Sequence, residues 1–345
     1  MDCKPSPVAT LHRTNGQSPN TAVNVVLAAA CILLSGTLQS QAQAQSYPNK
    51  PVRLISGSEP GGPVDTLARE LAPPIAEGLG QPVLVENRTG AGGSIGADYV
   101  AKAAPDGYTL LLASPAAISI GPYLNPNIRY DPVKDFAPIS NIGVSYFLLV
   151  VHPGSVPAMT VKEFVEFARA RPGQLSFGSA GNGTVTQLGA VLLNGMAGIK
   201  AEHIPYKGGG PALQDLVGGR TQYMIAPQVA SSTLVKAGKL RALAATGPKR
   251  SALSPQLPTI AEAGFPGYDI NSWYGVFAPG GTPAAILNRV NAPIVRHVKS
   301  PQVRDRLFAQ GLETLGSTPG EFAQTIRVES QMYAKLIKEA GVKIQ

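Results

Sequence analysis

The chain has 345 residues, of which 44% are hydrophobic and 14% charged, with a formal net charge of +8. This composition is typical of a compact globular protein and excludes an intrinsically disordered chain. The 29 Lys and Arg residues form no run and have no aromatic residues interleaved among them, which argues against nucleic-acid binding. The modest positive charge favours capture of an anionic small molecule, although an ordinary solvated surface explains it equally well.

The first 44 residues have the order of a secretory signal peptide. Lys4 and Arg13 lie in a polar segment, an unbroken apolar run covers 25–34, and the small-residue sequence Ala-Gln-Ala follows at 42–44. The apolar run is well short of the about 20 residues that a membrane-spanning helix needs. We therefore expect export to the periplasm, with cleavage near Ala44.

Both cysteines of the chain, Cys3 and Cys31, precede the expected cleavage site. Apolar residues, and no polar tether, follow Cys31, so it does not resemble a lipoprotein acceptor. The mature protein is expected to have no cysteine, which removes disulfides, thiolate metal sites and thiol nucleophiles from consideration.

Short β-branched runs alternate with amphipathic segments along the rest of the chain. This pattern predicts an α/β protein with parallel or mixed sheets flanked by helices. The predicted strands are 52–56, 83–86, 108–113, 147–151, 175–178, 223–225, 242–245 and 273–278.

Several predicted helices have readable ends. Thr160 and Glu163 form a capping box, Pro301 begins a helix that Gly311 stops, and Thr318 opens a long last helix that Gly341 closes. Another helix starts near Pro63, and the prolines at 73–74 should kink or shorten it.

No internal repeat or low-complexity linker divides the chain, so a lobe boundary should fall on extended segments. The runs 147–152 and 271–279 each join blocks of strands and helices without a Gly/Ser-rich spacer. A double crossover there predicts one lobe from residues 45–149 and 271–345 and a second lobe from 150–270. A single large sheet is the alternative.

The sequence ISGSEPGGPVDTLAR places a glycine-rich turn between a predicted strand and a predicted helix. Glycines allow close approach of a ligand, and the free N–H groups and dipole of a helix N-terminus attract an anion. Thr66 could add a hydroxyl donor. Asp65 could accept a hydrogen bond from the ligand, or it could simply favour the helix N-terminus.

A second glycine-rich turn at 177–184 has the same position between a strand and a helix, and a third candidate covers 203–210. Two such turns facing one another would hold an anion from both sides, since ligands lie at the carboxyl ends of parallel strands.

The sequence lacks complete motifs for nucleotide binding and for catalysis. No Gly-Lys-Ser/Thr follows the first turn, and Ile95 stands where a dinucleotide fingerprint needs its third glycine. No G-x-S-x-G occurs, and Ser179 has only His203 as a conceivable base. His152 and His297 are isolated, so we expect no metal site, no cofactor and no catalysis, although a hydrolase using Ser179 stays open as a minor alternative.

Segments spread over the chain from Tyr47 onward resemble one family: the Bug-type extracytoplasmic receptors of tripartite tricarboxylate transporters. The segments are YPNKPVRLI, PGGPVDTLAR, VENRTGAGGSIGADYVAKAAPDGYTLLL, GSAGNGTVTQL, HIPYKGGGPALQDLVGG, AGKLRALAATGPKR and LPTIAEAGFPGYDINSWYGVFAPGGTP.

The resemblance implies a type II periplasmic-binding-protein fold with a double-crossover hinge. It implies a monomer that closes on a small organic acid and delivers it to a two-subunit membrane permease; a ligand sensor for a signalling ectodomain is the alternative. Carried over from the family, the ligand-binding residues are Gly62, Asp65, Thr66, Ser114, Pro115, Ala116, Ser179, Ala180, Gly181, Asn182, Gly183, Thr184 and the position of Ala226.

Two departures from the family leave the ligand open. Ala226 stands where family members often have an acidic or amide residue that contacts the far end of the ligand. Ser114 and Pro115 replace the more usual glycine and threonine run.

Overall fold

The computed structural model describes Met1 and residues 47–342. Residues 2–44 of the expected signal peptide, with the cleavage site, lie outside the described residues. In the part of the chain that the structure does describe, no helix has the length and apolar character that crossing a membrane requires. Residues Pro48–Gln345 form one compact unit, which contains all the strands described below.

One lobe is built on a mixed sheet with the strand order β2-β1-β3-β9-β4. The three parallel strands β1, β2 and β3 lie on one side, and β9 runs antiparallel to both β3 and β4. The bounds are β1 (Val52–Ser56), β2 (Val83–Asn87), β3 (Thr109–Ala113), β4 (Phe136–Val151) and β9 (Asn271–Pro279), with the short β10 (Glu313–Thr314) paired to β4.

The other lobe continues from the same long strand. Residues Phe147–Val151 of β4 pair antiparallel with β7 and with β8, and β7 and β6 run parallel to β5. The bounds are β5 (Leu175–Ser179), β6 (Ala201–Pro205), β7 (Tyr223–Pro227) and β8 (Arg241–Ala245).

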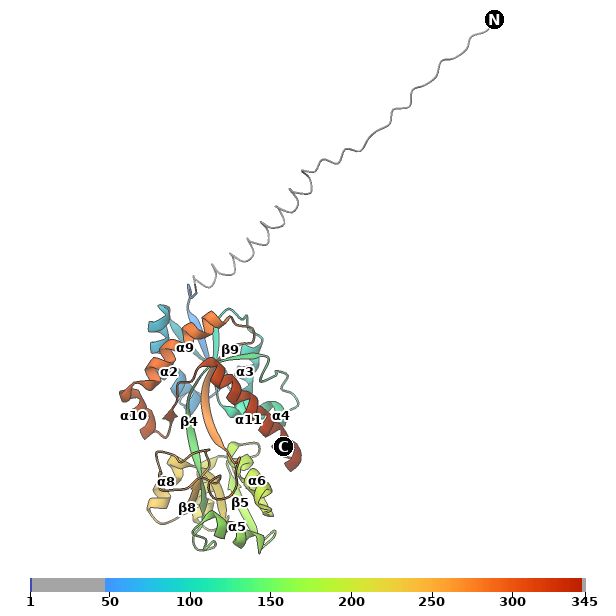
Figure 1. Cartoon of the computed structure of the whole chain (residues 1–345), viewed down its shortest axis with the longest axis vertical. Helices are drawn as coiled ribbons and strands as arrows, with labels where there is room; N and C mark the ends of the chain where they lie inside the picture. Colours follow the sequence, from blue (N-terminus) through green and yellow to red (C-terminus); the bar gives the residue numbers. More distant parts are fainter. Residues whose placement is uncertain (2–46, 343–345) are drawn as a thin grey trace. The chain divides into compact units, whose positions relative to one another are not determined.

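The strand β4 passes from one sheet into the other, with its change of partners between Tyr146 and Phe147. Strand β9 begins at Asn271, opposite Tyr146, and runs beside β4 in the first lobe (Figure 1). The strands thus form one continuous path, and the two-lobed α/β fold is confirmed. The residue bounds 45–149, 150–270 and 271–345 remain a prediction, and the strand pairing places the first crossing a few residues earlier, after Tyr146.

Helices flank both sheets, and the predicted caps are present. The Thr160 side chain accepts from the Glu163 N–H, Thr318 and Glu321 form a reciprocal capping box, and Gly341 ends the last helix in the left-handed conformation. The bounds are α2 (Pro63–Leu79), η1 (Ala91–Gly93), α3 (Ser94–Ala101), η2 (Ala116–Ile120), α4 (Gly121–Leu124), α5 (Val161–Arg169), α6 (Val185–Ala197), α7 (Gly209–Val217), α8 (Gln228–Lys236), α9 (Ala284–Lys299), α10 (Pro301–Ala309) and α11 (Pro319–Ala340).

The prediction that prolines shorten α2 was wrong. The helix continues through Pro73 and Pro74 to Leu79. Pro73 is exposed and Pro74 half-buried, so water can reach the carbonyl groups that lose their N–H partners. The buried side chains of Leu71, Ile75 and Leu79 keep the opposite side of the helix packed.

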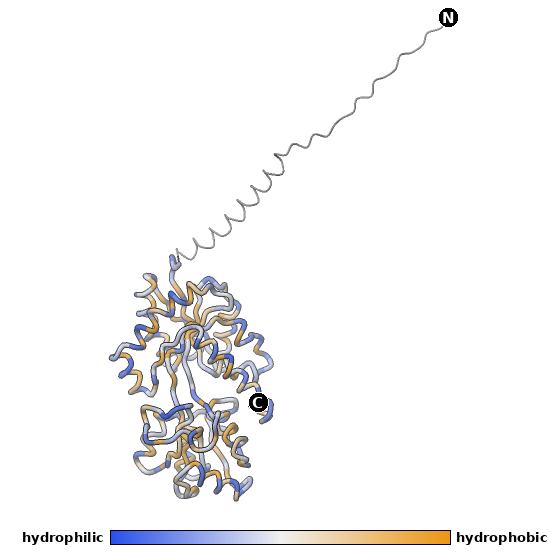
Figure 2. Tube along the Cα trace, viewed as in Figure 1, coloured by the Kyte–Doolittle hydropathy of each residue, from blue (hydrophilic) through white to orange (hydrophobic). Residues whose placement is uncertain are grey.

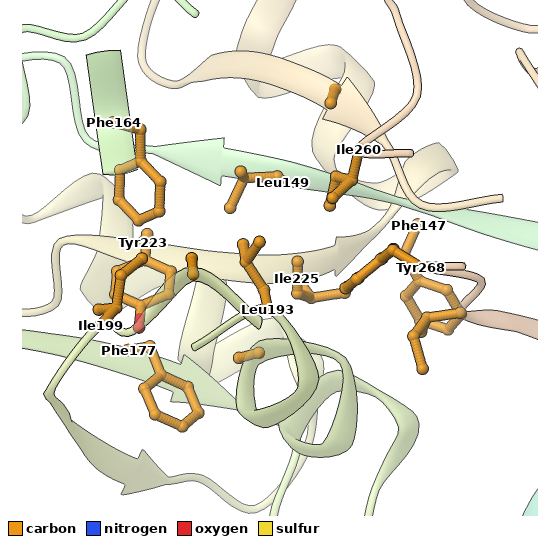
Figure 3. Close-up of a cluster of buried hydrophobic side chains, with 14 of the residues drawn as sticks. Phe147, Leu149, Phe164, Phe177, Leu193, Ile199, Tyr223, Ile225, Ile260 and Tyr268 are labelled. Atoms are coloured by element: carbon orange, nitrogen blue, oxygen red, sulfur yellow. The ribbon is translucent and has the colours of Figure 1, made fainter. Parts of the chain in front are cut away.

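Residues 147–151 are apolar without interruption because both faces of the sheet are covered. Phe147, Leu149 and Val151 pack into a core with α5 and α6, whereas Leu148 and Val150 pack into a second core on the other face. Figure 3 shows Leu149 among the aromatic rings of the first of these cores, with Phe164, Phe177 and Tyr223 nearby.

The long helix α11 contributes to the cores of both lobes. Phe322 and Ile326, near its start, pack against Trp273 and Phe277 of β9. Tyr333, Leu336 and Ile337, near its end, belong to the core that contains Phe164 and Phe177 of the second lobe. The last described turns of the chain therefore touch the second lobe, although the sequence assigned the whole of 271–345 to the first.

The outer helices are amphipathic. Hydrophobic and hydrophilic residues alternate along them (Figure 2). In α9, Ile286, Val290, Ile294 and Val298 are buried at a spacing of four residues, which places them on one face of the helix.

Candidate functional site

A cavity of about 360 Å³ opens at the carboxyl ends of the parallel strands of the first lobe. This edge of an α/β sheet is where ligands usually bind. Segments that follow β1, β2 and β3, together with the last two residues of β3 and one residue of β9, form its wall: Gly57, Ser58, Glu59, Pro63, Val64, Thr89, Gly90, Gly92, Gly93, Leu112, Ala113, Ser114, Ala117 and Tyr274.

Two glycine-rich segments meet in this wall without side chains between them. A Cβ atom on Gly57 would lie 2.8 Å from the Cα of Gly93, and a Cβ atom on Gly96 would lie 3.3 Å from the Cα of Gly57. Any larger residue at Gly57 would push the segments after β1 and β2 apart. This close approach explains why both strand ends are followed by glycine.

Of the predicted ligand-binding residues of the first lobe, Ser114 after β3 lines the cavity, but Gly62, Asp65 and Thr66 of the first turn are not among its lining residues. Thr66 lines a neighbouring cavity that shares Pro63 and Tyr274 with it. The N–H of Gly62 donates to the Glu59 carbonyl at 2.9 Å, which closes the turn before α2.

Asp65 is buried and its carboxylate is occupied by protein donors. It accepts from the Gly61 N–H at 2.8 Å, from Arg69 Nε at 3.0 Å and from Asn87 Nδ2 at 2.7 Å. The hydrogen bond from Arg69 is the main reason that its pKa falls to about 2, against the opposing effect of burial. Asp65 therefore joins the turn to α2 and to β2. This agrees with the second role considered for it, at the helix N-terminus, and not with a contact to the ligand.

Replacing Asp65 with asparagine is expected to lower the free energy of unfolding at neutral pH by about 1 to 3 kcal/mol, because a buried charge-assisted network loses its acceptor. The wild-type carboxylate contributes stability above pH 3.8, its value in the unfolded chain, and this contribution disappears as the pH falls to about 2. Urea denaturation across this pH range measures both effects. Asp98→Asn, at an exposed pair with Lys102, is the matched control and should change stability little.

The glycine-rich turn of the second lobe, residues 179–184, is held by a buried network. Ser179 Oγ lies 2.7 Å from His203 Nε2, and His203 Nδ1 lies 3.1 Å from Gln187 Nε2. The other amide atom of that glutamine, Oε1, accepts from the Gly183 N–H at 2.6 Å.

This network assigns the protons of His203. Because Gln187 Oε1 accepts from Gly183, its Nε2 must be the donor to His203 Nδ1, so the imidazole proton sits on Nε2 and is donated to Ser179. Burial lowers the His203 pKa, which favours this neutral form. An imidazole that donates to a serine hydroxyl does not act as its base, which weighs against the hydrolase alternative.

Most donors of this turn are already used within the protein. The N–H groups of Ala180 and Gly181 donate to Thr186 and Ser179, and the Thr184 hydroxyl donates to the Gly181 carbonyl at 2.7 Å. Within residues 180–184, only the N–H of Asn182 has no acceptor in the described part of the chain. Beside it are the first N–H groups of α6, which Thr184 caps by accepting from Gln187.

Three of the predicted contact residues lie differently from expectation. Ala226 is fully buried in β7 and its methyl group packs in the core with Leu148 and Met224, so the side chain is not directed to a ligand. Pro115 and Ala116 begin the short helix η2, outside the residues that line the cavity. Glu59, Thr89 and Tyr274 line the cavity but were missed; the position of the first two in the loops that follow β1 and β2 was the available signal.

The model of the tripartite tricarboxylate transporter family receptor matches residues 67–342. The chain belongs to this family. The receptor is 37% identical over 303 residues to the protein BugT of Bordetella pertussis, an alignment that covers 88% of this chain and 93% of BugT. A solved structure that is 33% identical to the chain is that of the periplasmic binding protein BugD, and the expected resemblance is confirmed.

Solved structures agree with this assignment. Rpa4515 of R. palustris, solved with adipate, is 36% identical with a TM-score of 0.69, covering 86% of the receptor and 99% of that chain. MatC from Rhodopseudomonas palustris, solved with bound malate, is 33% identical with a TM-score of 0.66, covering 84% and 100%.

Proposed function

We propose that this receptor captures a small organic carboxylate between its two lobes in the periplasm and delivers it to a two-subunit membrane permease of the tripartite tricarboxylate type. The observation that carries the proposal is a glycine-rich strand-to-helix turn in each lobe, one lining a cavity and the other leaving unpaired N–H groups at the start of α6. Relatives solved with adipate and malate support the class of ligand.

The ligand carboxylate would bind where backbone donors converge. The N–H of Asn182 and the N-terminus of α6 would donate from the second lobe, and the hydroxyl groups of Ser114 and Tyr274 from the cavity of the first lobe. Burial raises the Tyr274 pKa, so its hydroxyl remains a neutral donor. Partial positive charge at helix N-termini favours an anion at such a position.

Closure would bend the two strands that join the lobes, β4 and β9. A ligand that contacts both lobes stabilises the closed form in proportion to the contacts that only this form allows. Delivery then depends on recognition of the closed form by the permease. Uptake in a deletion strain with constitutive transport genes separates this role from that of a ligand sensor, since a pure sensor leaves uptake intact.

Thr184→Val tests the assigned turn. The variant removes the hydrogen bond to Gly181 and the cap of α6, so the Asn182 N–H is no longer held in place. We expect carboxylate affinity to fall by about 5- to 150-fold, or about 1 to 3 kcal/mol, in isothermal titration calorimetry with acids found in a thermal-shift screen. Thr184→Ser keeps the hydroxyl and should bind nearly as the wild type does.

Thr160→Val is the matched control, because it removes a similar cap from α5 of the same lobe, away from the turn. It should cost about 1 kcal/mol of stability without changing affinity. Wild-type affinity in the Thr184→Val variant would mean that the turn is not the binding site. No response of the wild type to any organic acid, with none co-purifying, would count against the receptor function itself.

A further inference from the structure

The cavity of the first lobe carries an unusual charge for a carboxylate receptor. Among the described residues that line it, the ionisable side chains are Glu59 and Tyr274, and there is no lysine, arginine or histidine. The cavity wall therefore offers an incoming anion one carboxylate and no cation.

Other carboxylates around this edge of the sheet have cationic partners. Asp65 is paired with Arg69, and Glu86 lies 3.8 Å from Arg53 and 4.0 Å from Arg88. Glu59 differs, because its side chain forms no hydrogen bond or ion pair within the described residues. Arg53, Arg69 and Arg88 are thus each paired with a carboxylate other than Glu59.

The backbone at Glu59 is nevertheless fixed. Its carbonyl accepts from the Gly62 N–H at 2.9 Å, and the preceding Ser58 accepts through Oγ from the Asp65 N–H at 3.0 Å. The hydrogen bonds around Asp65 thus hold the backbone of Glu59 at the cavity wall. The Glu59 side chain is exposed, so water solvates its carboxylate in this structure.

Closure of the lobes would remove water from this carboxylate. A buried charge without a partner is strongly unfavourable, and a second carboxylate of a dianionic ligand would add repulsion. An ammonium or other cationic group of the ligand removes both penalties, because charge-assisted hydrogen bonds replace the lost water.

We propose that the ligand is an amino-carboxylate, with a cationic nitrogen group in addition to its carboxylate, and that Glu59 binds this nitrogen group. The inference rests on the proposed receptor function and narrows its ligand class. The second-lobe turn, with the hydroxyl groups of Ser114 and Tyr274, would bind the carboxylate, and Glu59 in the first-lobe cavity would bind the cationic end. Selectivity against dicarboxylates follows from the negative charge of Glu59.

The test compares matched pairs of probes that differ at one end: 6-aminohexanoate with adipate, and aspartate with malate. Dissociation constants are measured by isothermal titration calorimetry for the wild type, Glu59→Gln and Glu86→Gln. We expect the wild type to prefer the amino member of at least one pair, and Glu59→Gln to reduce that preference by about 10-fold or more. Glu86→Gln removes a carboxylate of the same lobe outside the cavity and should keep the preference.

The outcomes separate the two proposals. A wild type that prefers the dicarboxylate of both pairs, or a preference that is the same in Glu59→Gln, overturns the role of Glu59 and leaves the receptor function standing. A wild type that binds none of the four probes, and no other organic acid in the screen, overturns the receptor function together with the inference.

Discussion

Raising the pH from about 5 to about 8 is expected to lower the free energy of unfolding by about 2 to 3 kcal/mol through one buried carboxyl group, Glu329. This residue of α11 is buried beside β9, where Trp273 Nε1 donates to its Oε2 at 2.5 Å. Burial raises the Glu329 pKa to about 7, and the negative charge of Asp269 acts in the same direction, while the bond from Trp273 opposes it.

The sign of this pH dependence follows from the pKa of Glu329 in the folded and in the unfolded protein. Glu329 binds its proton more tightly in the folded protein, with a pKa of about 7, than in the unfolded chain at 4.5. Its stabilising contribution is therefore complete below about pH 4.5 and is lost as the pH rises through about 7. Asp269, whose pKa burial also raises, adds a change of the same sign.

Glu329→Gln should remove most of this dependence, because the amide keeps an acceptor for Trp273 and cannot ionise. Urea denaturation of both proteins at the two pH values measures the difference, and the fluorescence of Trp273, the single tryptophan, reports titration of the folded state directly. Glu339→Gln, at an exposed position of the same helix, is the control. A pH dependence that is unchanged in Glu329→Gln would assign it to other groups.

Phe322→Ala is expected to lower the free energy of unfolding by about 3 to 5 kcal/mol. Phe322 is fully buried, with its ring 5.2 Å from that of Trp273 and 4.9 Å from that of Phe277. The ring lies directly over Gly275 of β9, where a Cβ atom would be 2.1 Å from Phe322 Cζ. Deleting it leaves a cavity between α11 and a strand that joins the lobes.

Val328→Ala, at an exposed site of α11, is the matched control and should change stability by less than about 0.5 kcal/mol. Gly275→Ala provides a second test, since its methyl group would displace the ring and cost about 1 to 3 kcal/mol in the wild type. That cost should shrink in the Phe322→Ala background, because the two residues share one space. A cost below about 1 kcal/mol for Phe322→Ala would show that the core closes over the deletion.

Local signals in the sequence determined much of the fold. The predicted strand 52–56 matches β1 residue for residue, and the caps at Thr160 and Thr318 are present because capping depends only on residues within one turn. The glycine-rich turns also follow from local chemistry, and the segments that resemble the receptor family agree with the family match.

The bounds of strands without an apolar run were not predicted, although a strand end was expected at 203–205 before the third glycine-rich turn. The edge strand β6 contains the exposed Glu202 and the half-buried His203, so it has little apolar patterning of its own. The first part of β4 contains Pro138 and Gly143 and has register shifts opposite β9. Pairing with strands distant in the sequence holds both segments extended.

The sequence by itself determined the class of the protein: an α/β receptor with a glycine-rich strand-to-helix turn in each half of the chain. Only the tertiary structure decided which polar groups of those turns remain available to bind a ligand. Asp65 is occupied by Arg69 and Asn87, and the turn at 179–184 is occupied by His203 and Gln187, whereas the side chain of Glu59 has no partner among the residues that the structure describes. The physical reason is that a polar group is available to a ligand only when no residue from another element has already satisfied it, and sequence spacing does not reveal those partners.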